Sequence, residues 1–201
     1  FRRVLFRSLS LLFSSSDNYN DVMGLYHPTP NTVFIDTEFT PTSKQWLSLG
    51  AVCGNDSFYC ETGDVALLRA AKKEFEEANL QIKVLDQWGK AWLPGSVPSL
   101  AHCGFLFHQW MSHFTESRLF IAYDYSHDMQ LLEDAIAACG LSWPKHWEPC
   151  YLGILNDDPA GDTAKEVMWH TMKRHFHLER HHALADAFAL QAAYQVQIGA
   201  S

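Results

Sequence analysis

The sequence predicts an α/β protein in which helices flank a mixed β-sheet. The first observation is a set of three short β-type segments, separated by turns, which is typical of an antiparallel meander. The second is that later β-type segments alternate with helical ones, which is typical of parallel strands joined by crossover helices. We therefore expect the fourth and fifth strands to run parallel to the first.

The individual elements follow from apolar periodicity and from turn residues. Alternating or β-branched apolar runs predict strands at 32–35, 45–52, 57–60, 118–122 and 147–155. Apolar residues spaced three and four apart predict helices at 64–78, 98–114, 128–139, 163–176 and 183–196. Gly54 marks a tight turn, Gly140 caps a helix end, and residues 156–161 are predicted to form a loop. The pattern of residues 82–92 is ambiguous.

The composition fits a globular domain of ordinary size. The chain has 201 residues, of which 47% are hydrophobic, so it can bury a sizeable core. Its formal net charge of −8 argues against nonspecific coating by nucleic acid, while a local site for nucleic acid stays compatible with it. No apolar run approaches the length of a membrane span, so we expect no membrane partner.

The cysteines bear on the expected location. There are five of them, an odd number, and no C-x-x-C pair occurs. This pattern predicts neither a disulfide framework nor a zinc ribbon. A reducing, cytoplasmic setting is the expectation that follows.

Residues 1–22 are expected to be a non-native or disordered leader. Phe1 to Ser8 resembles the translation of a sequencing-adaptor oligonucleotide, and the serine-rich stretch after it is typical of disorder. Met23 is a natural initiator, because the first convincing strand begins shortly after it. We therefore expect a single domain over residues 23–201.

Two carboxylates, Asp36 and Glu38, follow the first predicted strand. Alternate residues of a strand point to the same side, so both acids would aim at one point in space. Like charges placed that close are costly unless a cation lies between them, and hard divalent ions prefer carboxylate oxygens. The pair therefore predicts a site for Mg²⁺ or Mn²⁺, with solvated acids at a strand end as the alternative.

Two later segments add further acids. Asp128 begins a predicted helix directly after a buried strand, where a carboxylate can also be an ordinary helix cap. Asp186 lies in an Ala- and Leu-rich helix, where a partly buried acid needs a partner unless it lies on the polar face. His181 lies just before this helix. A strand end and two helix starts are where α/β sheets place ligand sites, so we expect these residues to converge.

The motifs D-x-E, D-x-x-L-L and H-x-A-L-x-D occur in this order and resemble those of the DEDDh exonucleases, the DnaQ-like group with an RNase H-like fold. The resemblance covers residues 32–195. Within that group, Ile35 to Phe39, Leu47 to Val52, Phe58 to Glu61 and His181 to Asp186 are similar to the RNase AS-like exoribonuclease branch.

The resemblance implies a 3′→5′ exonuclease that hydrolyses phosphodiester bonds of single-stranded nucleic acid, RNA more than DNA. Two Mg²⁺ or Mn²⁺ ions would be held by Asp36, Glu38, Asp128 and Asp186. His181 would be the general base that deprotonates the attacking water. The implied partners are the 3′ end of single-stranded RNA or DNA and a second copy of the chain in a homodimer.

One motif departs from the family pattern. Relatives commonly have Asn and Phe at the positions that Asp124 and His127 hold here. Asp124 adds an acid close to the site, where it could approach the metal ions or point to water. The metal ligand expected in this motif, Asp128, is in place.

The substrate contacts are less specific. Phe39 is the best candidate for stacking on a base, Trp46 and Tyr125 are weaker ones, and packing is the commoner role of such side chains. The family implies that the main-chain amide of Thr37 contacts the terminal nucleotide. Two other functions stay open: a hydrolase of very short oligonucleotides, and a catalytically idle nucleic-acid-binding module of the same fold.

Overall fold

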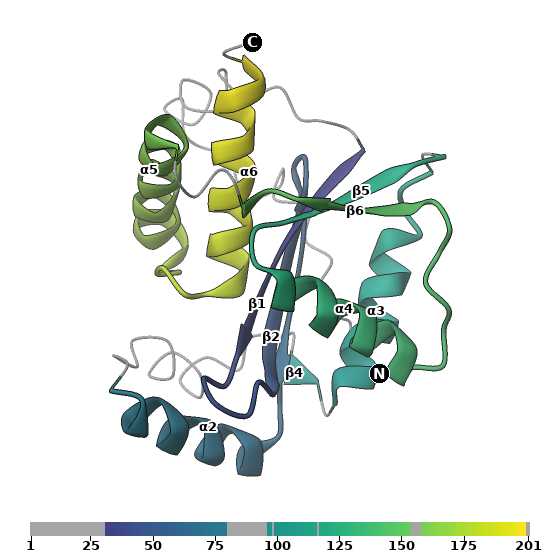
Figure 1. Ribbon diagram of the computed structural model, residues 1–201, viewed down its shortest axis with the longest axis vertical. Coiled ribbons are helices and arrows are strands. Elements are labelled where there is room, and N and C mark those ends of the chain that lie inside the picture. The colour runs from purple at the N-terminus through teal and green to yellow at the C-terminus, as the bar shows by residue number, and fades with distance from the viewer. Residues whose placement is uncertain (1–30, 80–95, 98, 116, 154–157, 200–201) are drawn as a thin grey trace.

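The computed structural model describes residues 31–79, 96–97, 99–115, 117–153 and 158–199 (Figure 1). The leader expected at 1–22 and the ambiguous range 82–92 lie outside the described residues. Within them, helices cover both faces of a sheet that contains parallel and antiparallel strands. The prediction of an α/β fold with a mixed sheet is therefore confirmed.

The sheet has six strands in the order β4-β3-β2-β1-β5-β6. Their bounds are β1 Thr32–Phe39, β2 Trp46–Cys53, β3 Asp56–Thr62, β4 Ser96–Val97, β5 Leu119–Tyr123 and β6 Trp147–Tyr151. The first three strands pair antiparallel, and β5 and β6 run parallel to β1, both as predicted. The short β4, which pairs parallel with β3, was not expected.

The first strand is longer than the sequence suggested. Its prediction ended at residue 35, but pairing with β2 continues through Phe39, with Asp36 opposite Gly50 and Glu38 opposite Ser48. Acidic residues have low strand propensity, and here the pairing with the neighbouring strand overrides it. The acidic pair therefore lies inside the strand and not after it.

The helices are α2 Val65–Glu77, α3 Leu100–Met111, α4 Ser126–Ala138, α5 Pro159–Phe176 and α6 Ala183–Gly199. Side-chain caps set where several of them begin, with Asp64 capping α2 and Ser99 capping α3. Asp158 accepts a hydrogen bond from the backbone N–H of Gly161, and Pro159 suits the first turn of a helix. As a result α5 begins at Pro159, so the predicted loop at 156–161 is partly helical.

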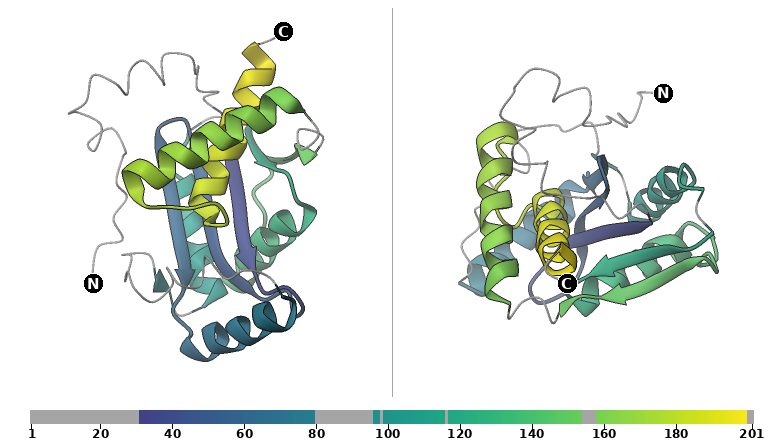
Figure 2. Two further views of the ribbon diagram at one scale, coloured as in Figure 1. Left: turned by 90° about the vertical axis from the view of Figure 1, so that its left-hand side faces the viewer. Right: turned by 90° about the horizontal axis from the view of Figure 1, so that it is seen from above.

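Helices α5 and α6 lie on one side of the sheet, and α3 and α4 lie on the other, whereas α2 lies beyond one end of the strands (Figures 1 and 2). Val33 and Ile35 of β1 belong to the larger core, which includes the buried residues of α3 and α4. Phe34 points the other way and packs with Leu190 of α6. This alternation puts the two acids that follow in β1 on the α6 side.

A disulfide joins Cys60 of β3 to Cys103 of α3, and both residues are fully buried. This pair corrects the expectation drawn from the cysteine pattern. The odd count and the spacing could not indicate it, because the two residues meet only when α3 packs on the sheet. Among the described helices, none combines the length and apolarity that crossing a membrane requires.

Candidate metal centre

Asp36 and Glu38 lie on the side of the sheet where α6 begins. They alternate with Thr37 along β1, so the period of two places them on one face. Gly50 lies opposite Asp36, and a Cβ atom on it would come within 2.3 Å of the carbonyl carbon of Ala183. Because Gly50 has no side chain, the start of α6 can approach β2 next to the strand that carries the acidic pair.

Asp128 lies in the first turn of α4 and is 1% exposed. Its Oδ1 accepts two hydrogen bonds from Thr37, one from the backbone N–H at 3.2 Å and one from the hydroxyl at 2.7 Å. Its Oδ2 is buried and has no hydrogen-bond partner among the described residues. A buried oxygen without a partner is costly, so this atom is a place where a cation would be favourable.

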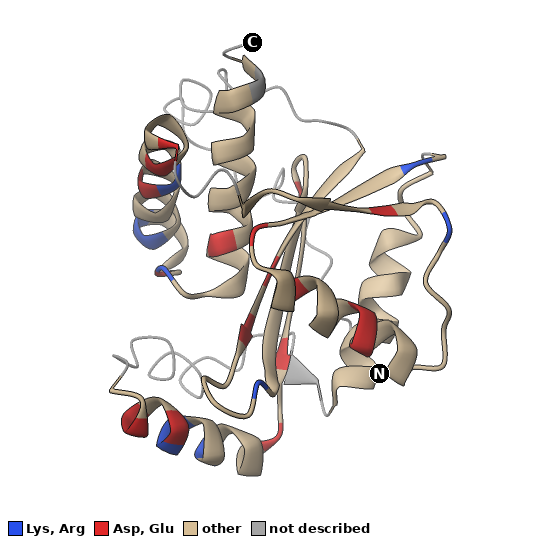
Figure 3. Ribbon diagram, in the orientation of Figure 1, with Lys and Arg blue, Asp and Glu red and all other residues tan. Residues whose placement is uncertain are grey.

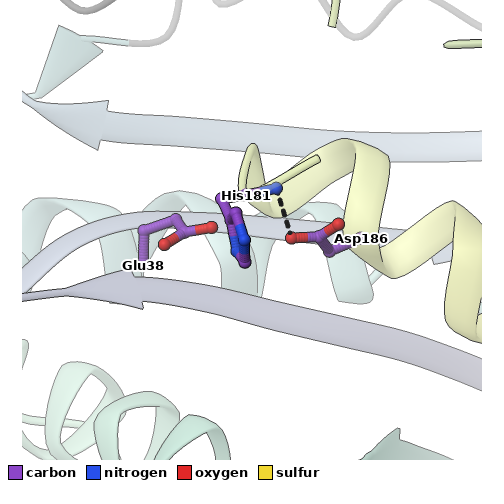
Figure 4. Close-up of side chains that lie close together, drawn as sticks. All are labelled: Glu38, His181 and Asp186. Atoms are coloured by element: carbon purple, nitrogen blue, oxygen red, sulfur yellow. Dashed lines mark hydrogen bonds between the residues drawn. The ribbon is translucent and has the colours of Figure 1, made fainter. Parts of the chain in front are cut away.

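Asp186 lies in the first turn of α6, and both of its oxygens accept hydrogen bonds. The indole Nε1 of Trp169 donates to Oδ1 at 2.6 Å, and the backbone N–H of His181 donates to Oδ2 at 2.9 Å. Figure 4 shows the second bond and the imidazole of His181 beside the carboxylates of Glu38 and Asp186. His181 has a φ of 67°, which few non-glycine residues adopt, and in this conformation both its amide and its ring face the acids.

The structure brings the predicted site residues together in two groups. In each group, ligand atoms of three side chains lie within 4.8 Å of one another: Glu38, His181 and Asp186 in the first, and Asp36, Asp124 and Asp128 in the second. The two groups lie next to each other, since the carboxylates of Glu38 and Asp186 raise the pKa of Asp36 by electrostatic repulsion. Figure 3 shows acidic positions on β1, α4 and α6 near the centre of the molecule.

The electrostatics of these acids are those of a crowded, partly buried site. Burial raises the pKa of Asp36 and of Glu38 well above the usual values, and the neighbouring carboxylates raise both further. Burial likewise raises the pKa of Asp128 and of Asp186 to about 7, against the opposing effect of the hydrogen bonds that they accept. A divalent cation among them would favour the ionised forms instead.

The donor set suits a hard divalent cation. Carboxylate oxygens dominate it, and such oxygens are the ligands that Mg²⁺ and Mn²⁺ prefer. The buried Oδ2 of Asp128 could serve as a metal ligand, because it accepts no hydrogen bond in the described part of the chain. The acidic groups could therefore hold a metal ion.

The two adjacent histidines have different surroundings. The ring of His181 faces the acids, and its partial loss of solvent together with the charge of Arg180 lowers its pKa below the usual value. His182 is 3% exposed and stacks on Tyr59, with ring centroids 4.5 Å apart. Burial lowers the pKa of His182 to about 4, so its ring is neutral near pH 7. Only His181 is placed to exchange a proton with a ligand at the acids.

Asp124, which comes from the turn before α4, forms an ion pair with a residue of α5. Its Oδ2 lies 3.0 Å from Nζ of Lys165 on α5. Sequence reasoning missed Lys165, as it missed the hydrogen bond from Trp169 to Asp186. The available signal was that Lys165 and Trp169 lie four residues apart and so share one side of α5.

Side chains that were predicted to contact the substrate pack against one another. The rings of Phe39 and Tyr125 stack with centroids 5.9 Å apart, the ring of His127 meets Phe39 edge-on, and Nζ of Lys44 lies 4.9 Å from the centre of the Phe39 ring. Tyr125 is 50% exposed. The amide of Thr37 binds Asp128, so a contact from it to a nucleotide would have to replace that bond.

Comparison with models of protein families found no match, and comparison with curated proteins found none either. The fold and the site define a class on their own: an α/β protein with a partly buried acidic cluster that could hold a divalent metal ion.

Proposed function

We propose that the protein is a metal-dependent 3′→5′ exonuclease that hydrolyses single-stranded nucleic acid, RNA more than DNA. The observation that carries the proposal is the convergence of β1, α4 and α6, which brings four carboxylates and one histidine from three distant motifs into one place. The order of these motifs resembles the DEDDh exonucleases, and the mixed sheet is compatible with their RNase H-like fold.

The metal ions would be held by Asp36, Glu38, Asp128 and Asp186. Bound there, two Mg²⁺ or Mn²⁺ ions would supply Lewis acidity for the attacking water and for the leaving 3′ oxygen. The hydrogen bonds to Asp128 and Asp186 fix the orientation of their carboxylates before any ion arrives.

His181 would take the proton of the attacking water. Its lowered pKa means that the ring is neutral near pH 7 and can accept a proton. Its ring lies beside Glu38 and Asp186, so an accepted proton would rest next to carboxylates that stabilise the imidazolium.

The 3′ end of the strand would be positioned by aromatic side chains next to the acids. Phe39 follows Glu38 directly and supports the exposed ring of Tyr125, which offers a face to a base. Lys44, beside Phe39, adds a positive charge that a phosphate could approach. An acidic protein would thus grip a single strand through stacking more than through an extended basic surface.

The test is a product ladder from 5′-labelled oligomers of matched ribo- and deoxyribo-sequence, incubated with Mg²⁺ or Mn²⁺. We expect stepwise shortening of the ribo-oligomer from its 3′ end, arrest by EDTA, and no shortening by the Asp36→Ala variant. Asp134→Ala is the matched control, because Asp134 is an exposed acid of α4 that faces solvent. Full activity of Asp36→Ala would refute the proposal.

The same experiment separates the other functions. Rapid cleavage of a dinucleotide with little cleavage of long strands would favour a hydrolase of very short oligonucleotides. Metal binding without hydrolysis of any substrate would favour a catalytically idle binding module.

A further inference from the structure

A buried ion pair borders the acidic site. Nζ of Lys165 on α5 lies 3.0 Å from Oδ2 of Asp124, and the two side chains are 9% and 22% exposed. Asp124 lies in the short turn between β5 and α4, so the pair links two segments that are 41 residues apart in the sequence. An ammonium group this buried needs an anionic partner, and Asp124 is one.

Asp124 also lies within reach of the proposed metal ligands. One of its oxygens is within 4.8 Å of ligand atoms of Asp36 and Asp128, so by distance alone it could be a fifth carboxylate of the centre. The two roles compete, because a carboxylate that neutralises Lys165 has less charge to offer a metal ion.

We propose that Lys165 is a positioning residue that holds Asp124 as its counter-ion and so keeps this carboxylate out of the metal coordination. The inference rests on the proposed function, since it concerns the same centre. The four carboxylates that remain carry a charge that matches two divalent ions. The additional negative charge of Asp124, at a position where the DEDDh motif commonly has Asn, is thereby neutralised by Lys165.

The pair is expected to be replaceable as a unit. Exchanging a buried ion pair for neutral side chains of similar volume is often neutral for stability, whereas removing one partner leaves an uncompensated charge. D124N/K165M and D124N/K165Q remove both charges while keeping the sizes of the side chains. K165M removes the cation alone and leaves a fifth uncompensated acid at the centre.

The experiment is titration of the full chain with MnCl₂ in a calorimeter, for the wild type, both double variants and K165M. We expect the wild type and at least one double variant to bind two Mn²⁺ ions with affinities within about threefold of each other. We expect K165M to bind Mn²⁺ about tenfold more tightly, because the negative charge of Asp124 is no longer compensated by Lys165 and adds to the attraction for the ion.

The outcomes separate the inference from the proposed function. Loss of one Mn²⁺ ion in the double variants would make Asp124 a ligand and overturn the inference alone. Unchanged Mn²⁺ affinity of K165M, or failure of both double variants to fold, would overturn it as well, since Lys165 would then have a purely structural role. A wild-type chain that binds no Mn²⁺ would overturn the proposed function itself.

Discussion

The variant Asp128→Asn tests whether the negative charge of Asp128 stabilises the metal-free fold or is useful only when a metal ion is bound. The side chain of Asn has nearly the same shape, so its Oδ1 can still accept both hydrogen bonds from Thr37. The amide nitrogen replaces the Oδ2 that has no hydrogen-bond partner among the described residues. The variant therefore removes the charge and keeps the contacts that anchor α4 to β1.

The magnitude follows from the pKa of the carboxyl group. Burial raises that pKa from an ordinary 3.8 to about 7 in the folded protein without metal. Each pKa unit corresponds to about 1.4 kcal/mol, so ionising Asp128 costs the fold about 4 kcal/mol above pH 7. The folded state keeps a proton that the unfolded chain has lost between about pH 4 and pH 7, so stability falls as the pH rises through this window.

The assay is urea unfolding of the wild type and the variant in EDTA at several pH values. We expect equal stability near pH 4 and a variant that is more stable at pH 8 by about 2 to 4 kcal/mol, the lower figure allowing for a buried amide group with imperfect partners. Added Mn²⁺ should stabilise the wild type and not the variant.

The control is Asp134→Asn, an exposed position on the same helix, which should change little at any pH. The reasoning would be refuted if Asp128→Asn were less stable than the wild type at pH 8 in EDTA. That result would mean that the negative charge stabilises the metal-free fold.

Three further predictions concern the same region. Mn²⁺ should bind more tightly at pH 8 than at pH 6 and release protons, because Asp128 and Asp186 have pKa values of about 7 in the metal-free protein. Calorimetry in buffers of different ionisation enthalpy measures the number of protons released. Burial lowers the pKa of His182 to about 4, so the wild type should lose about 3 kcal/mol of stability as the pH falls from about 6.5 to 4. His182→Phe should abolish this loss, as measured by urea unfolding. Gly50→Ala should lower the melting temperature and the Mn²⁺ affinity, because its Cβ would meet the backbone of α6, whereas Gly199→Ala has open space and should do neither.

The parts of the site that could be predicted are those set by local geometry. The period of two placed Asp36 and Glu38 on one face, and this holds because β1 continues through both acids. The alternation of strands and helices predicted the parallel direction of β5 and β6, which brings the start of α4 to the end of β1 that carries the acids. These inferences need only a few neighbouring residues and the usual handedness of crossovers.

The parts that could not be predicted depend on contacts between distant segments. Lys165 and Trp169 reach the acids only because α5 packs beside α6, and their shared side of α5 does not by itself identify the acids as its partners. The pairing of Cys60 with Cys103 depends in the same way on how α3 lies on β3. Amphipathic patterns locate a buried side, but they do not identify the partner that the side meets.

The hydrogen bonds around the acids explain how a costly cluster can be held in place. Thr37 uses its backbone N–H and its hydroxyl on a single oxygen of Asp128, which leaves the other oxygen without a bond among the described residues. Trp169 and the amide of His181 fix the orientation of Asp186 in the same manner. These donors lower the pKa of each acid, yet burial outweighs them and both values stay near 7. The protein thus orients the carboxylates, and a divalent cation bound among them would favour their ionised forms.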